Sequence, residues 1–260
     1  MNRLALILLV VLGTARAATA DPVIGRVLTA PTAWLPEQGT LVGTAGVDRR
    51  GDGSVLLAYG LGLASIEFGT DTDVRGCTAC DGDLKGDALW LGRAAFRLGA
   101  RQDAWFPGMP AVVVGLRNTF AARGHKFGGA RVTDAYLVGS RVLGPVRLHI
   151  GGSVTDGGFR QVSLGPTVRP LAGFEWTPVP YPKTSVLGDV MWIPKLELDH
   201  VKLEWVAGWG VRYQALKYGS IELAVRHRQD EGLQESTVLV RVNGVWNPRR
   251  DPPKNRIADR

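Results

Sequence analysis

The 260-residue sequence contains few of the residues that usually carry chemistry or crosslink small exported folds: two cysteines, three methionines and four histidines. Beyond the N-terminus it lacks any apolar run of the ~20 residues that a membrane-spanning helix needs. Its 34 glycines do not follow a G-X-Y repeat, which excludes collagen. The net charge of +7 falls to +5 without residues 1–20, a balance too small to indicate a nucleic-acid partner.

The common catalytic and nucleotide-binding fingerprints are also absent: GxSxG, HExxH, the phosphate-binding loop and the dinucleotide motif. Asp199 and His200 could mimic an omptin-type protease pair. Adjacent residues on a strand point to opposite faces, however, so a solvated loop pair is favoured.

His227 and Ser236 could approach each other across the last hairpin, as a lipid esterase or phospholipase would need, but no acidic partner for a triad is evident. His125 and His149 are isolated in the sequence. We therefore expect no enzyme, no cofactor and no catalytic metal.

Residues 1–20 have the features of a signal peptide. Arg3 precedes an apolar run from Leu4 to Leu12, and Ala18-Thr19-Ala20 is a small-residue cleavage site ahead of Asp21. The mature protein is therefore expected to be exported.

The two cysteines, Cys77 and Cys80, lie in one polar loop. In an exported chain they form either a local disulfide or half of a metal site. A single CxxC pair without a second pair or nearby histidines argues against zinc, so we favour a disulfide between Cys77 and Cys80.

What the sequence does have is period-two alternation along nearly the whole mature chain. From Val201 to Tyr213 the odd positions are all apolar, while the even ones include Lys202, Glu204 and Arg212. We count twelve such segments. They begin near Thr40, Ser54, Ala64, Gly86, Ala111, Ala135, Val146, Pro170, Ser185, His200, Ser220 and Ser236.

Every second connection between these segments is long and polar, and the others are mostly short, with Arg101–Pro110 and Pro178–Lys183 as longer exceptions. A sandwich has no reason to alternate in this way, whereas a transmembrane barrel has long external loops, short periplasmic turns and an even strand number. The prediction is an all-β protein: a single antiparallel transmembrane β-barrel of about 12 strands in the bacterial outer membrane.

The expected organisation is a signal peptide at 1–20, a lead-in or plug at 21–39, the barrel at 40–246 and a disordered periplasmic tail at 247–260. Two aromatic belts are expected at the membrane interfaces. Trp176, Tyr213 and Trp246 belong to the periplasmic belt, and Trp90 and Trp192 belong to the external belt.

Three stretches resemble the YjbH-like family of outer-membrane barrels, which is found with exopolysaccharide secretion genes. They are VLTAPTAWLPEQGT at Val27–Thr40, PAVVVGLRNTF at Pro110–Phe120 and AYLVGSRVLG at Ala135–Gly144, and Pro170–Val190 is similar to the family's next hairpin. The PTA segment is the specific part of the match. The resemblance implies an envelope role tied to polysaccharide and supplies no catalytic residues.

Alternation assigns an excess of positive side chains to the lumen. These are Arg93, Arg97, Arg117, Arg141, Arg147, Lys202, Arg212, Arg226, Arg228 and Arg241, against Glu67, Glu175, Asp189, Glu204 and Glu222. If water fills the lumen, this excess predicts anion selectivity. If the arginines are paired with the acids, they instead hold a closed barrel rigid.

The leading interpretation is a non-enzymatic pore or accessory conduit in envelope or exopolysaccharide export. The expected partners are outer-membrane lipid, anionic solutes or polysaccharide, and a periplasmic export partner. The alternative is a plugged structural or adhesive barrel, and a lipid- or peptide-hydrolysing barrel is less favoured. The lumen positions Ser153 and Ala224 are expected to tolerate arginine.

Overall fold

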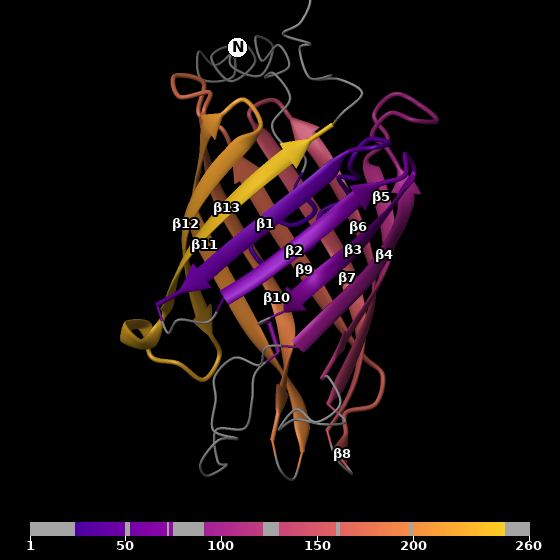
Figure 1. Cartoon of the computed structure of the whole chain (residues 1–260), viewed down its shortest axis with the longest axis vertical. Helices are drawn as coiled ribbons and strands as arrows, with labels where there is room; N and C mark the ends of the chain where they lie inside the picture. Colours follow the sequence, from indigo (N-terminus) through magenta and orange to yellow (C-terminus); the bar gives the residue numbers. More distant parts are fainter. Residues whose placement is uncertain are drawn as a thin grey trace, which may run out of the picture.

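The computed structural model describes residues 24–49, 53–71, 73–74, 91–121, 130–159, 162–197 and 200–247. Twelve long strands in these ranges form one antiparallel sheet that closes into a barrel (Figure 1). They are β1 Leu41–Asp48, β2 Gly53–Gly60, β3 Ala64–Asp71, β4 Leu91–Ala100, β5 Ala111–Phe120, β6 Arg131–Leu143, β7 Val146–Phe159, β9 Thr167–Trp176, β10 Thr184–Leu196, β11 Val201–Leu216, β12 Gly219–Arg228 and β13 Thr237–Trp246. The two-residue β8 (Val162–Ser163) pairs antiparallel with the end of β7, and η2 (Leu233–Glu235) is a short 3-10 helix.

Closure of the sheet comes from the pairing of the first and last strands. Leu41 of β1 lies opposite Trp246 of β13. β6 pairs with β7, and all pairs of neighbouring strands are antiparallel. This confirms the twelve-stranded barrel expected from the alternation. No helix among the described residues is long and apolar enough to cross a membrane.

The side chains are arranged inside out relative to a soluble protein. Ile150 of β7 points outward and is 68% exposed, whereas Arg97 of β4 and Glu222 of β12 point inward and are buried. An apolar outer wall around a charged interior is the arrangement of a transmembrane β-barrel, since hydrocarbon surrounds the outside. The chain is therefore an outer-membrane β-barrel of the bacterial type.

The two rims of the barrel differ. β1 begins and β13 ends at one rim, which we take as periplasmic. β6, β7, β10 and β11 extend the wall at the other rim (Figure 1). Trp176, Tyr213 and Trp246 are exposed at the periplasmic rim, as expected.

Several expectations lie outside the described residues: the signal peptide at 1–20, the pair Cys77 and Cys80, Trp90, and the tail beyond Asn247.

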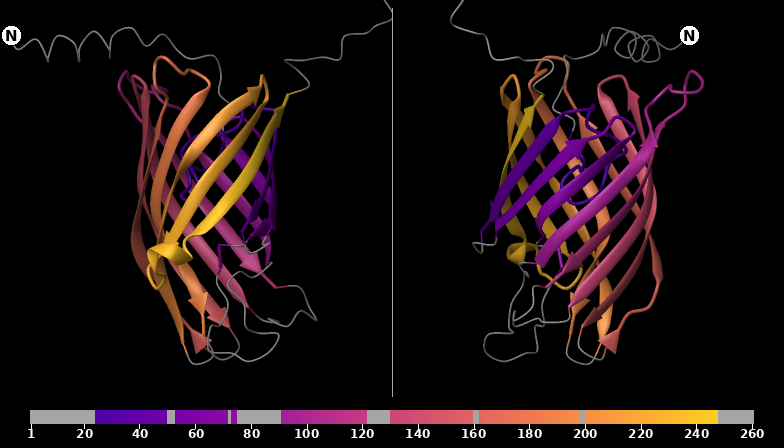
Figure 2. Two further views of the ribbon diagram at one scale, coloured as in Figure 1. Left: turned by 90° about the vertical axis from the view of Figure 1, so that its left-hand side faces the viewer. Right: turned by 45° about the vertical axis from the view of Figure 1, so that its right-hand side comes forward.

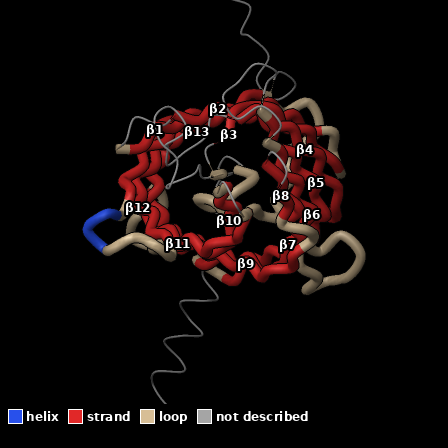
Figure 3. Tube along the Cα trace, turned by 90° about the horizontal axis from the view of Figure 1, so that it is seen from below, coloured by secondary structure: helices blue, strands red, loops and turns tan. Residues whose placement is uncertain are grey.

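The segment from Ile24 to Gly39, which we call the plug, lies inside the barrel (Figures 2 and 3). Its apolar side chains Ala30, Ala33 and Leu35 pack in one cluster with inward residues of β5, β6, β9, β10 and β11. Gly60 of β2 permits its close approach to the wall, because a Cβ there would overlap the backbone of Pro36 and Glu37.

A second apolar cluster closes the external end of the lumen. Leu196 of β10 and Val201 of β11 pack with Leu91 of β4 and Val132 of β6. Because β4 lies six strands from β11 in a barrel of twelve strands, the contact with Leu91 crosses the lumen. The described residues at the end of the β10–β11 hairpin, Leu196 and Val201, thus reach into the lumen near its external end.

The filled interior overturns one expectation. Ala224 is buried in a cluster with Val27 and Leu28 of the plug, and Ser153 is also buried. Arginine at Ala224 would have to displace the plug or remain in an apolar contact, so this position should not tolerate it.

The outward face gives a direct test of membrane depth. Ile150→Arg, in the middle of the outer wall, should lower the free energy of unfolding by ~2–4 kcal/mol, because its charge enters hydrocarbon. The matched control is Val179→Arg in the β9–β10 connection, where a side chain of similar exposure (61%) lies at the rim. Its cost should be about 0–1 kcal/mol. Urea unfolding in phospholipid vesicles measures both, and equal costs would contradict the placement of the outer wall.

Candidate functional site

The plug enters the lumen as a tight turn. Arg26 and Pro31 form an isolated antiparallel β-bridge, and the amide of Val27 donates to the carbonyl of Ala30 at 2.9 Å. The amide of Thr32 donates to the carbonyl of Gly25 at 3.0 Å. These internal bonds leave other plug amides and carbonyls directed at the wall, and wall side chains must satisfy them because burial without a partner is costly.

Asp189 of β10 holds the tip of the turn. Its Oδ2 accepts the backbone amides of Leu28, Thr29 and Ala30 at 3.0, 2.6 and 2.7 Å. Successive amides that converge on one oxygen form an anion-binding nest, which the buried carboxylate fills. Hydrogen bonds to a charged acceptor are the stronger kind, so Asp189 is the principal fastening of the plug.

Arginines of the wall bind the plug's carbonyl groups. Arg241 of β13 donates to the carbonyl of Leu28 at 2.7 Å, and Arg212 of β11 donates to that of Val27 at 3.4 Å. Arg97 of β4 donates to the carbonyls of Thr32 and Trp34. Polar side chains of the wall thus hydrogen-bond to the backbone of the plug, while apolar side chains of the plug pack against apolar side chains of the wall.

A buried serine, histidine and glutamate form the last fastening. The amide of Ala33 donates to Oγ of Ser140 at 2.7 Å, and that Oγ lies 2.7 Å from Nδ1 of His149. Nε2 of His149 lies 3.5 Å from a carboxylate oxygen of Glu175, and the ring packs edge-on against Trp34. His149, judged isolated from the sequence, is therefore part of a buried cluster.

This series has the residue types of a hydrolytic triad, but the plug seals it. Ser140, His149 and Glu175 are all buried, and the serine oxygen already accepts the plug's amide. A nucleophile needs room for a substrate carbonyl beside it. The arrangement therefore positions the plug and offers no open active site.

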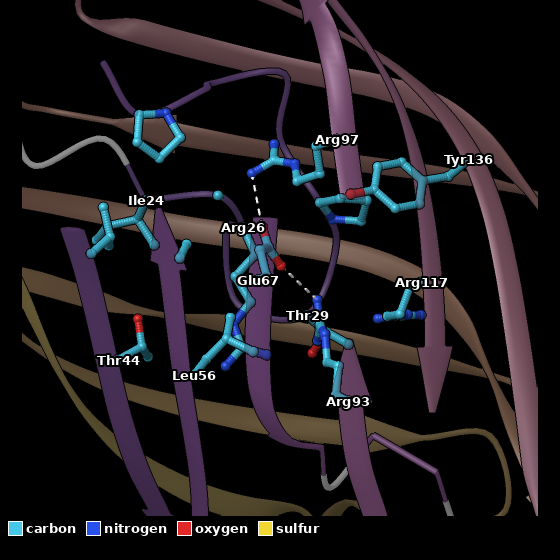
Figure 4. A pocket seen from close by; sticks show the side chains of 15 residues that line it. Ile24, Arg26, Thr29, Thr44, Leu56, Glu67, Arg93, Arg97, Arg117 and Tyr136 are labelled. Carbon is cyan, nitrogen blue, oxygen red and sulfur yellow. Dashed lines mark hydrogen bonds and ion pairs between the residues drawn. The ribbon is translucent and has the colours of Figure 1, made fainter. Parts of the chain in front are cut away.

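Nine of the ten cations assigned to the lumen do point inward. Most of them meet carboxylates across neighbouring strands. One series of ion pairs, which we call the charge ladder, runs along the inner wall from β7 to β13. Its members, in order, are Arg147 (β7), Glu175 (β9), Arg212 (β11), Glu222 (β12) and Arg241 (β13). The distances between successive members are 3.4, 2.9, 2.7 and 3.0 Å. Arg93 and Arg97 share Glu67 at 3.2 and 3.1 Å, and Figure 4 shows this group beside the plug.

The remaining inward cations are also paired. Arg117 meets Asp134 at 2.6 Å, Arg226 meets Asp73 at 2.8 Å, and Arg228 meets Glu231 at 3.4 Å. Lys202, nearer the external mouth, lies 2.9 Å from Glu204.

The assignment of Arg141 to the lumen is wrong. Arg141 lies opposite Leu148, an outward residue, and is exposed, whereas its neighbour Ser140 points inward. The sequence count also missed three buried acids, Asp73, Asp134 and Glu197, and two buried cations, Arg26 and Lys195, so the excess of positive charge inside is smaller than expected. Burial alone would raise the pKa of Asp73, but Arg226 and Arg26 outweigh burial and hold this pKa well below its usual range.

The structure brings His227 and Ser236 together on the outer wall near the external rim. Nδ1 of His227 lies 3.1 Å from Oγ of Ser236, and the imidazole packs against the ring of Trp205. Among the described residues no carboxylate forms an ion pair with His227, so that part of the chain supplies no third member of a triad. Asp199 and His125 lie outside the described residues, which leaves the pair Asp199–His200 untested.

No family model and no curated protein matches the chain. Among solved structures, it is similar to an active-site mutant of outer membrane phospholipase A from Escherichia coli, with 12% identity, a TM-score of 0.45 and coverage of 86% of this chain and 96% of that one. It is also similar to the outer membrane protein OmpT of Vibrio cholerae, with 12% identity, a TM-score of 0.36 and coverage of 80% and 98%.

The translocator domain of the autotransporter NalP from Neisseria meningitidis matches at 13% identity and a TM-score of 0.38, with coverage of 80% of this chain and 86% of that one. At these values no activity or substrate is transferred from any of the three.

The plug can be tested by proteolysis at Arg26, which is buried while the plug is in place. Asp189→Ala removes the acceptor of three amides, each worth ~1.5–3 kcal/mol as a bond to a charged group. Trypsin should then cleave between Arg26 and Val27 at least ~10²-fold faster than in the wild type. Mass spectrometry of the fragments measures the cleavage.

The matched control is Asp156→Ala, which removes the same charge from an exposed position. A slower gel mobility after boiling verifies that each variant is still a folded barrel. Equal protection of Arg26 in the wild type and in Asp189→Ala would show that Asp189 does not hold the plug.

Proposed function

We propose that this protein is a plugged outer-membrane barrel that serves the cell envelope as a closed scaffold and does not act as a standing pore. The observation that carries the proposal is the plug itself, whose backbone is bound by Asp189, Arg97, Arg212, Arg241 and Ser140 at the middle of the lumen. This favours the second of the two non-enzymatic alternatives that the sequence leaves open.

The external hairpin tip adds a second barrier. Leu196 and Val201 close the mouth through apolar contacts with the opposite wall, so a solute that passed the plug would meet a dry constriction. Two barriers in series make a steady ion current improbable in this conformation.

The ion pairs argue against a selective anion pathway. Glu175 and Glu222 each contact two arginines, so the field that a row of unpaired arginines would create is largely cancelled. Three of these four pairs instead join neighbouring strands, as cross-strand contacts of opposite charge do, and the fourth, Arg212–Glu175, spans β10. A rigid wall suits a scaffold.

The envelope process that the scaffold serves is a proposal from the YjbH-like resemblance alone. On that resemblance we place the barrel with exopolysaccharide export, beside a periplasmic export partner and an anionic polymer. The closed lumen then favours an accessory role at the export site over passage of the polymer through this chain.

Planar-bilayer recordings test the closure. We compare the wild type, a variant without residues 24–35, the double variant Leu196→Asp with Val201→Asp, and the combination. Only the combination should conduct steadily, because each of the other proteins keeps at least one barrier. Gel mobility before and after boiling confirms folding of each. Steady porin-sized conductance of the wild type would refute the closed scaffold.

A further inference from the structure

The connection between β4 and β5, residues 101–110, is longer than a periplasmic turn needs to be and is well ordered by its own bonds. The amide of Asp103 donates to the carbonyl of Met109 at 3.0 Å, and the amide of Gly108 donates to the carboxylate of Asp103 at 2.7 Å. Asp103 has φ 60° and Gly108 has φ 87°. A residue other than glycine in the left-handed region is uncommon, which indicates that the bonds of the loop fix its shape.

This ordered loop exposes its most apolar side chains. Trp105 is 79% exposed and Phe106 is 58% exposed, while Met109 is buried and secures the base. The loop leans away from the barrel axis at the periplasmic rim (Figure 2, right). Large aromatics held out of contact are costly in water, so a rigid loop that presents them is suited to a surface that covers them.

The neighbouring hairpin supplies charge and further apolar surface. The side chain of Gln102 accepts the amide of Val142 at 2.9 Å, which ties the loop to the β6–β7 turn. A Cβ on Gly108 would lie 3.4 Å from Nη2 of Arg141, so this guanidinium lies against the loop. Val142 and Leu143 beside it are exposed.

We propose that the β4–β5 loop is a membrane anchor. In this arrangement Trp105 and Phe106 enter the interface of the periplasmic leaflet, and Arg141 binds the phosphate of an anionic phospholipid there. Arg141 lies on the outer face of β6, and this is the face of the barrel that contacts lipid. Guanidinium groups bind phosphate oxygens through paired donors. Aromatic side chains at the interface fix how deeply the barrel sits in the membrane.

Two features favour lipid over a periplasmic protein. The loop lies at the same rim as the exposed aromatic side chains of Trp176, Tyr213 and Trp246. The charge also fits, because Arg101 and Arg141 are both exposed, whereas residues 101–110 carry one carboxylate, that of Asp103, which accepts the amide of Gly108. The anchor is independent of whether the lumen is open.

The first test measures the depth of the loop. A fluorescent dye is attached at Phe106→Cys in a background of Cys77→Ser and Cys80→Ser, and the protein is folded into phosphatidylcholine vesicles with phosphatidylglycerol. Lipids carrying a nitroxide at the carbonyl level should quench this dye about threefold more than a dye at Lys217→Cys in the β11–β12 turn of the same rim. Equal, weak quenching at both sites would overturn the proposal.

The second test separates lipid phosphate from a general effect of charge. Phosphatidylglycerol should raise the equilibrium constant for folding of the wild type about fivefold more than that of Arg141→Gln. Arg141→Lys should retain part of this increase. An identical response of the wild type and Arg141→Gln would overturn the phosphate contact. If the dye at residue 106 stays in water in vesicles and shifts only on addition of periplasmic extract, the loop docks a protein and the lipid anchor is wrong.

Discussion

The requirement that every backbone amide and carbonyl in hydrocarbon has a partner governs this structure. An open twelve-stranded sheet would leave two edges unpaired, and pairing of β1 with β13 removes both. Closure in turn creates an interior that is too wide for strand side chains alone to fill. In this barrel the plug and the inward end of the β10–β11 hairpin occupy that space, which water fills in open channels.

Charge inside the barrel follows from the same geometry. A wall whose outer face must be apolar puts its polar residues inside, and there a charged group needs a partner. The charge ladder provides this through register: Arg147 lies directly opposite Glu175, Arg212 opposite Glu222, and Glu222 opposite Arg241. A slip of one residue would turn these side chains toward lipid, so the ladder specifies strand pairing as well as filling space.

The sequence predicted the wall well because alternation is a local signal. All twelve strands were located, and the segment ahead of the first was recognised as a possible plug. Arg141 was misplaced because both faces of β6 carry apolar residues, such as Leu137 outside and Val138 inside, so alternation there does not identify the lumen side. The binding of plug amides by Asp189 and by Ser140 joins residues far apart in the chain, which no local pattern reports.

The strength of the plug's attachment bears on what the barrel can do. Release of the turn breaks three bonds to Asp189, and at ~1.5 kcal/mol each the open state would be about 10³-fold rarer than the closed one, before the arginine contacts are included. Thermal fluctuation therefore leaves the lumen shut, and only a ligand or partner that binds the open state with a comparable preference could shift the balance. Binding of lipids or partners in the closed state is then limited to the outer wall and the rims, where the His227–Ser236 pair and the aromatic loop lie.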